Sequence, residues 1–146
     1  MPVDVVPGVS SAFAVPAAAG IPVTHRGTAA AFHVITGHAG LDAAARTVLT
    51  EGSATLVVLM GVSVLTELVA DALAAGTPPW TPVAIIEEGT TARQRVTHAR
   101  LDTVVVRAAA VGVRAPAVIV VGDVAAPGLL DPHGRAPVNP DATMDT

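Results

Sequence analysis

Short, almost entirely apolar runs constrain the fold of this chain more than any other feature. The runs are Ala54–Met60, Val83–Glu87 and Ala117–Val121. Runs of this length and composition are typical of strands that are buried on both faces. Such strands need packed layers above and below them, so we expect a sheet between helical layers. Alanine and valine supply much of the apolar content, which indicates a core of small side chains.

The remaining elements are predicted between these strands. The segment Val62–Ala75 has apolar residues at helical spacing and ends before Gly76. A first helix is predicted from Ser10 or Ser11 to Ala19; Pro16 should kink or shorten it, and Gly20 can close it. The other predicted elements are a strand over Ala31–Thr36, a helix over Leu41–Thr50, a loop over Thr77–Pro82, a strand over Arg95–Ala99 and a helix over Leu101–Ala110. Because strands and helices alternate, we expect an α/β fold with a mixed, largely parallel sheet and flanking helices.

Composition narrows the possible functions. About half of the residues are apolar (51%), enough for one domain with a core, which we place at residues 1–125. The segment 126–146 is rich in Pro, Gly and Asp, and we expect a flexible tail there. The charged fraction of 14% and the net charge of −4 do not indicate a basic surface that would bind nucleic acid. With no cysteine and no spacing of histidines that suits a metal, we expect no metal site; without a membrane-spanning run, we expect a cytoplasmic protein.

Several motifs follow one another in a fixed order. They are Val6-Pro7-Gly8-Val9-Ser10-Ser11-Ala12, Gly20-Ile21-Pro22-Val23-Thr24-His25-Arg26-Gly27, Thr36-Gly37-His38, Leu59-Met60-Gly61, and Glu87-Glu88-Gly89-Thr90-Thr91. Together they resemble the tetrapyrrole methylases, and among these the uroporphyrinogen-III C-methyltransferases, over most of Met1 to Val124. The resemblance implies S-adenosylmethionine as cofactor, uroporphyrinogen III as substrate and precorrin-2 as product, in sirohaem or cobalamin synthesis. It also implies that this chain corresponds to the C-terminal lobe of such an enzyme.

The resemblance assigns cofactor contacts to Ser10, Ser11, Met60 and Gly89. Each of them has an ordinary structural alternative: the serines can cap a helix, Met60 can fill the core, and Gly89 can serve a turn that needs positive φ. Glu88 stands where the family often has Asn, so a side-chain contact from that position is in doubt.

Substrate contacts are expected from cationic side chains, because a tetrapyrrole of this class carries many carboxylates. We assign His25 and Arg26 to this role, with Arg93 and Arg95 as weaker candidates. The alternative for Arg26 is a solvated charge or a salt bridge to another lobe.

The first lobe of the resembling enzymes carries Gly-Pro-Gly-Asp and Gly-Gly-Asp-Pro motifs and the proposed acid–base residues. Neither motif occurs in this sequence, so no catalytic residue can be assigned. We expect a partner in an N-terminal lobe, inactivity of the isolated chain, and a homodimer as in the family. The alternatives are another member of the family, acting on a precorrin, diphthine or ribosomal RNA, and a non-catalytic binding or dimerisation module.

Overall fold

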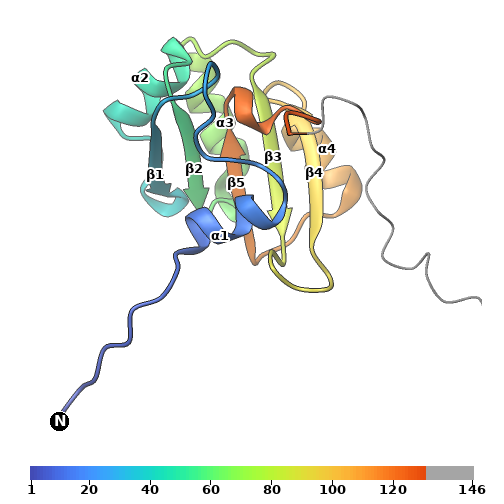
Figure 1. Ribbon diagram of the computed structural model, residues 1–146. Coiled ribbons are helices and arrows are strands. Elements are labelled where there is room, and N and C mark those ends of the chain that lie inside the picture. Colours follow the sequence, from blue (N-terminus) through green and yellow to red (C-terminus); the bar gives the residue numbers. More distant parts are fainter. Residues whose placement is uncertain (131–146) are drawn as a thin grey trace, which may run out of the picture.

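A sheet of five strands organises the structure, a computed structural model that describes residues 1–130 (Figure 1). The strands are β1 (Phe32–Thr36), β2 (Thr55–Leu59), β3 (Pro82–Glu87), β4 (Arg95–Arg100) and β5 (Ala117–Val121). The helices are α1 (Ser11–Ala18), α2 (Ala43–Glu51), α3 (Leu65–Ala74) and α4 (Val104–Val111), with short 3₁₀ turns at Gly37–Ala39, Val62–Val64 and Asp123–Ala125. Residues 131–146, most of the segment expected to be a flexible tail, lie outside the described residues.

The expectation of a largely parallel sheet is wrong. The strand order is β1-β2-β5-β3-β4, and only β1 and β2 pair in parallel. The last strand, β5, lies between β2 and β3 and pairs antiparallel with both, and β3 pairs antiparallel with β4. Continuous apolar runs correctly indicated strands buried on both faces. Burial does not fix strand direction, which depends here on where β5 inserts.

The two faces of the sheet have different covers. Alternate residues of each central strand point to opposite sides, so Leu56 and Val58 join one core cluster and Val57 joins the other. Helices α2, α3 and α4 pack on the first face through residues such as Leu49, Leu68 and Val104. Among the described residues, the second face is covered by α1, the segment after it, the Asp123–Ala125 turn and Leu129. In Figure 1 this second, more lightly covered face is turned toward the viewer.

Local sequence explains the helix ends. The Ser10 hydroxyl accepts a hydrogen bond from the Ala12 N–H at 3.2 Å and caps α1. Pro16 lies inside α1 and is buried, and the helix continues to Ala18 before Gly20 takes a left-handed φ of 70°. The carboxylate of Asp42 caps α2 by accepting from the Ala45 N–H at 2.7 Å.

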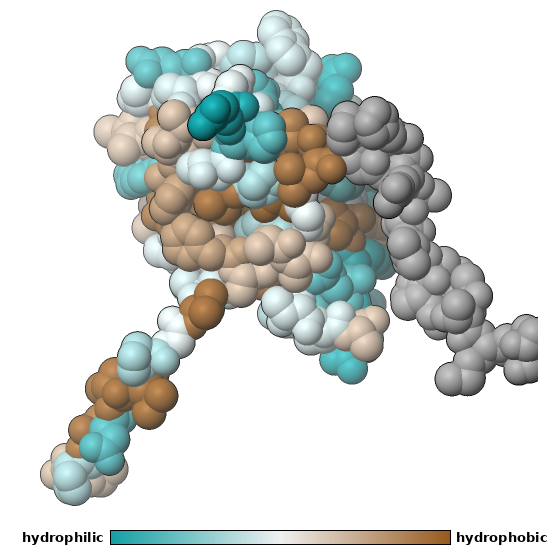
Figure 2. Space-filling view, in the orientation of Figure 1, coloured by the Kyte–Doolittle hydropathy of each residue, from teal (hydrophilic) through white to brown (hydrophobic). Residues whose placement is uncertain are grey.

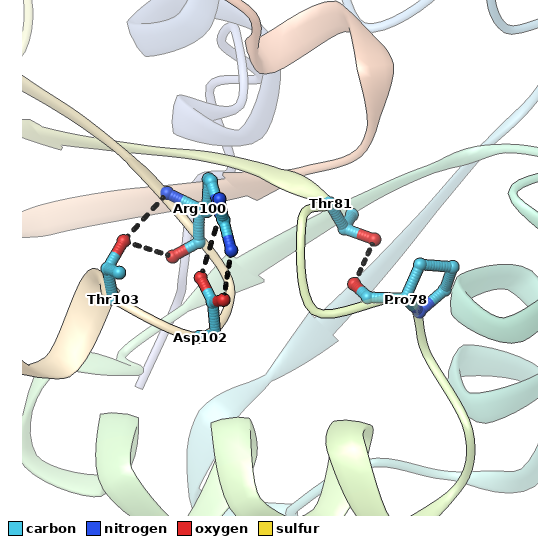
Figure 3. A network of polar contacts seen from close by, with 5 residues as sticks. All are labelled: Pro78, Thr81, Arg100, Asp102 and Thr103. Atoms are coloured by element: carbon cyan, nitrogen blue, oxygen red, sulfur yellow. Dashed lines mark hydrogen bonds and ion pairs between the residues drawn. The ribbon is translucent and has the colours of Figure 1, made fainter.

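The sheet has two distinct ends. At the lower end in Figure 1, β1, β2 and β3 finish and β4 and β5 begin; the upper end is the opposite one. Figure 3 shows part of the upper end, where β4 finishes. There the Arg100 guanidinium pairs with the Asp102 carboxylate, and the Thr81 hydroxyl donates to the Pro78 carbonyl at 2.7 Å. These polar contacts close turns at the protein surface.

Candidate functional site

A cleft of about 1080 Å³ opens at the lower end of the sheet. Separate segments of the chain meet there: Ser11 and Val15 of α1, His38 after β1, Met60 after β2, Gly89 after β3 and Pro116 before β5. The walls combine apolar side chains with a few hydroxyl and charged groups. This composition suits a small amphipathic ligand better than a highly charged one.

Backbone strain gathers at this cleft. Met60, Glu88 and Thr90 have φ values of 53°, 45° and 69°, and they are the non-glycine residues with positive φ in the described part of the chain. All of them line the cleft. A left-handed conformation at a non-glycine residue costs about 1–3 kcal/mol and persists where the surrounding structure imposes it. Strain of this kind clusters at ligand sites, which makes the cleft the candidate functional site.

Glycines at the cleft allow unusually close packing. A Cβ atom at Gly37 would lie 2.6 Å from the Gly61 Cα and 2.8 Å from the Met60 carbonyl oxygen. One at Gly89 would lie 2.4 Å from a Val15 methyl group. Gly89 does not have a positive φ, so the turn explanation offered for it does not hold; its neighbours Glu88 and Thr90 have the left-handed backbone instead. Gly89 is needed because α1 packs directly on the loop after β3.

Hydrogen bonds hold the loop between β3 and β4 in place. The Thr91 hydroxyl donates to the Glu88 carbonyl at 2.8 Å, and the Thr90 N–H donates to the Gln94 side-chain oxygen at 2.8 Å. The Gln94 amide in turn donates to the Ala18 carbonyl at the end of α1, at 3.2 Å. The loop and α1 therefore form one connected wall of the cleft.

An ion pair with a buried carboxylate lies beside this wall of the cleft. The Arg95 guanidinium donates to both oxygens of the Glu87 carboxylate, at 2.7 and 2.8 Å, and the Arg114 N–H donates to the same carboxylate at 2.9 Å. The hydrogen bonds from Arg95, with a smaller contribution from the Arg114 N–H, hold the pKa of Glu87 below its ordinary value, against the opposing effect of burial. Glu87 is 5% exposed and ties β3, β4 and the start of β5 together.

The structure brings three of the predicted cofactor contacts together. Ser11, Met60 and Gly89 line the cleft, and Ser10 precedes them as the cap of α1. The side chain of Met60 is 58% exposed, which excludes the alternative that Met60 fills the core. The hydrogen bond from the Ala12 N–H to the Ser10 hydroxyl confirms the capping alternative for Ser10. A capping role is compatible with a position beside the cleft.

The expected substrate contacts lie elsewhere. His25 and Ala29 exchange backbone hydrogen bonds of 2.9 and 3.0 Å in a turn that contains Arg26, and neither His25 nor Arg26 lines the cleft. Their role as substrate contacts stays a prediction. Of the weaker candidates, Arg93 lines the cleft and pairs with Glu88 at 2.5 Å, whereas Arg95 pairs with Glu87.

Sequence reasoning missed several lining residues. Glu88 and Thr90 flank Gly89, and their left-handed backbone has no signal in residue type. Ala115 and Pro116 reach the cleft only because β5 inserts between β2 and β3. His38 reaches it because the Gly37 turn packs on the turn at Met60. Within residues 1–130, no cluster of side chains suits a metal ion and no helix is long and apolar enough to cross a membrane.

The family of the chain follows from comparison with known proteins. Residues 1–105 match the family model for tetrapyrrole (corrin/porphyrin) methylases. The chain therefore belongs to this family of α/β proteins.

Individual relatives agree with this assignment. The uroporphyrinogen-III C-methyltransferase of Methanocaldococcus jannaschii is 47% identical over 85% of this chain and 52% of its own length. A siroheme synthase of Gluconobacter oxydans is 42% identical over 82% of this chain and 26% of its own length. Uroporphyrin-III C-methyl transferase from Thermus thermophilus, in a crystal structure with S-adenyl homocysteine, matches with a TM-score of 0.66 and 37% identity, over 84% of this chain and 51% of that protein. The chain thus spans about half the length, or less, of these relatives.

Proposed function

We propose that this chain forms one lobe, the C-terminal one, of an S-adenosylmethionine-dependent methyltransferase that methylates carbon atoms of uroporphyrinogen III towards precorrin-2. The main observation in support is that Ser11, Met60 and Gly89, which are far apart in sequence, line one cleft. Every non-glycine residue with positive φ in the described part of the chain lines the same cleft. The names of the relatives support the reaction and the cofactor. A homodimer and a cytoplasmic location stay predictions.

The cleft fits the proposed cofactor chemically. S-adenosylmethionine has an apolar purine face, ribose hydroxyls and an amino-acid end, so it needs both apolar walls and hydrogen-bonding groups. Val15, Leu59 and Ile86 supply apolar wall, and the strained turns at Met60 and Glu88–Thr90 present backbone groups at its edge. Ser11 and Thr91 add hydroxyl groups.

The chain's contribution to the reaction would be binding and alignment. The bound cofactor supplies a methyl group on a sulfonium that is already activated, so the protein must chiefly hold the methyl in line with the attacking carbon. The rigid connection between α1, the Gln94 side chain and the loop after β3 holds one wall of the cleft in a fixed position. The exposed thioether of Met60 stands at the end of β2, where it can pack against the ligand.

The exposed face supports the proposal that a further lobe covers this one. Figure 2 shows apolar side chains gathered on the face that carries α1. Phe13 and Phe32 pack edge to face with centroids 5.0 Å apart, and each is 40% exposed, with Val34 beside them on β1 at 37%. Apolar groups grouped in this way on a surface are typical of an interface. We propose that a first lobe, of the kind that the longer relatives have room for, closes over this face.

The test of the cofactor site is binding of S-adenosylhomocysteine to the chain by isothermal titration calorimetry. Met60→Asp puts a carboxylate into the cleft, and we expect it to weaken binding at least tenfold through desolvation and repulsion of the ligand carboxylate. Val106→Asp is the matched control, because Val106 is 74% exposed on α4 and does not line the cleft. Equal affinities for both variants would contradict the assignment of the cleft.

The reaction itself needs a complete enzyme. A fusion of the N-terminal half of the Methanocaldococcus jannaschii relative to this chain provides one, and transfer of a labelled methyl group to uroporphyrinogen III measures it. We expect methyl transfer by the fusion and its loss on Met60→Asp. Cofactor binding without any methyl transfer to this substrate would favour a different substrate within the family, or a binding module.

A further inference from the structure

A second, polar hollow adjoins the cleft. It has a volume of about 470 Å³ and is lined by Glu87, Glu88, Arg93, Arg95, Arg114 and the residues around Gly112. It shares Glu88, Arg93 and Ala115 with the cleft, so the two spaces are neighbours across the Glu88–Arg93 ion pair. A molecule bound beside a ligand of the cleft can therefore place a side chain in the hollow.

The charges of the hollow do not cancel. Arg95 is engaged by the Glu87 carboxylate and the Gly112 carbonyl, and Arg93 is engaged by Glu88. Arg114 uses its backbone N–H to bind Glu87, but among the described residues its guanidinium has no ion pair and no hydrogen bond. One uncompensated positive charge is thus left at the wall of the hollow.

The position of Arg114 is fixed by its backbone. Its N–H donates to the buried Glu87 carboxylate at 2.9 Å, and the next residues, Ala115 and Pro116, line the cleft itself. The main chain at Arg114 is therefore anchored beside the cleft while its side chain stays free to bind. A guanidinium held in this way suits a carboxylate, which it can bind with two parallel hydrogen bonds.

We infer that this hollow receives a carboxylate of the tetrapyrrole substrate and that Arg114 is the residue that binds it. The inference rests on the proposed function, because it assumes that the cleft binds the cofactor and that the substrate bound next to the cofactor is a polycarboxylate. Arg114 would then select for substrates that carry an acidic side chain at the matching position. Glu87 pairs with Arg95 and Glu88 pairs with Arg93, so Arg114 is the arginine of the hollow whose guanidinium has no ion pair among the described residues.

The test compares two ligands and two arginines. Affinities of the full chain for uroporphyrin III, a stable polycarboxylate analogue of the substrate, and for S-adenosylhomocysteine are measured at low and high salt. We expect Arg114→Gln to weaken uroporphyrin binding by about twofold to fivefold at low salt, the range of a solvent-accessible ion pair, with the difference shrinking at high salt. Arg107→Gln is the matched control, because Arg107 is an exposed arginine of α4 outside the hollow.

Each outcome either supports or overturns the inference about Arg114. Weaker uroporphyrin binding by Arg114→Gln alone, with S-adenosylhomocysteine binding unchanged, supports the inference. Equal effects of Arg114→Gln and Arg107→Gln would overturn it, and so would a loss confined to S-adenosylhomocysteine, which would place the cofactor carboxylate at Arg114. A chain that binds S-adenosylhomocysteine but no uroporphyrin overturns this inference and leaves the cofactor site standing, whereas a chain that binds neither ligand overturns both.

Discussion

The two ends of the sheet handle left-handed backbone in different ways. At the upper end, the positions of positive φ next to β2, β3 and β5 are Gly52, Gly76 and Gly122, which adopt it without steric cost. At the lower end, Gly40 and Gly112 adopt it too, but Met60 and the pair Glu88 and Thr90 adopt it with side chains attached. Among the described residues, the strained non-glycine positions of positive φ therefore all lie at the lower end of the sheet.

The packing differs in the same direction. A Cβ atom at Gly52 would meet nothing within 4 Å, whereas one at Gly37 or Gly89 would overlap a neighbouring segment. The ion pairs differ in the burial of their carboxylates: the Glu87 side chain, paired with Arg95 at the lower end, is 7% exposed, whereas the Asp102 side chain, paired with Arg100 at the upper end, is 28% exposed. Connections between the strands of this sheet can therefore form without non-glycine residues at positive φ, because those at the upper end do so.

The largest expected effect comes from adding a methyl group to a glycine at each end. Gly37→Ala would place its Cβ against the backbone of Gly61 and Met60, and we expect it to lower the free energy of unfolding by about 3 kcal/mol. Gly52→Ala has open space and only a left-handed backbone to accommodate, so we expect about 1 kcal/mol. Urea unfolding followed by circular dichroism measures both. Equal losses would remove the packing contrast between the ends.

Removal of one carboxylate at each end gives a smaller effect. Glu87→Gln removes the charge of a buried carboxylate that accepts hydrogen bonds from the Arg95 guanidinium and the Arg114 N–H, and we expect a loss of about 2 kcal/mol in the free energy of unfolding. Asp102→Asn at the upper end should change it by less than about 0.5 kcal/mol, because the carboxylate of Asp102, unlike that of Glu87, is partly exposed to solvent. A larger loss for Asp102→Asn would reverse the comparison.

The pH dependence of this pair follows from the lowered pKa of Glu87. Because the pKa in the folded state lies below the ordinary value of 4.5, the pair contributes its full stability above pH 4.5. The contribution is lost as the pH falls through the folded-state pKa. The difference in unfolding free energy between wild type and Glu87→Gln should therefore shrink as the pH is lowered from 6 towards 3. A difference that stays constant over this range would exclude a lowered pKa.

The smallest expected effect is a gain of stability. Thr90→Gly relieves the left-handed backbone at a β-branched residue, and after the entropic cost of glycine we expect a net gain of about 0.5 kcal/mol. Thr24→Gly is the matched control: Thr24 is exposed and has no positive φ, so it should lose stability by a similar amount. Thermal unfolding distinguishes the two signs, and a loss for both variants would show that Thr90 is not strained.

Sequence reasoning predicted the elements of the fold better than their arrangement. Burial on both faces is visible in the composition of a strand, so β2, β3 and β5 were predicted nearly to the residue. The antiparallel insertion of β5 between β2 and β3 is a long-range pairing that no local pattern encodes. The sheet is mixed, as expected, but the expectation that it is largely parallel failed for this reason.

The candidate site was predictable only in part. Resemblance to the family pointed to Ser11, Met60 and Gly89, whose meeting in the cleft required the fold. The strain at Glu88 could not be read from glutamate, which has no preference for positive φ. Asn tolerates that conformation better than Glu, so Glu88 adds strain to this turn.

The central claim is that the strained lower end binds the cofactor and the relaxed upper end does not. Titration of the ¹⁵N-labelled chain with S-adenosylhomocysteine, followed by two-dimensional NMR, tests it directly. The account predicts that the amide signals of Ser11, Met60, Gly61, Gly89 and Thr90 shift on binding, while those of Gly52, Gly76 and Gly122 stay in place. Shifts confined to the upper end, or none at saturating ligand, would contradict it.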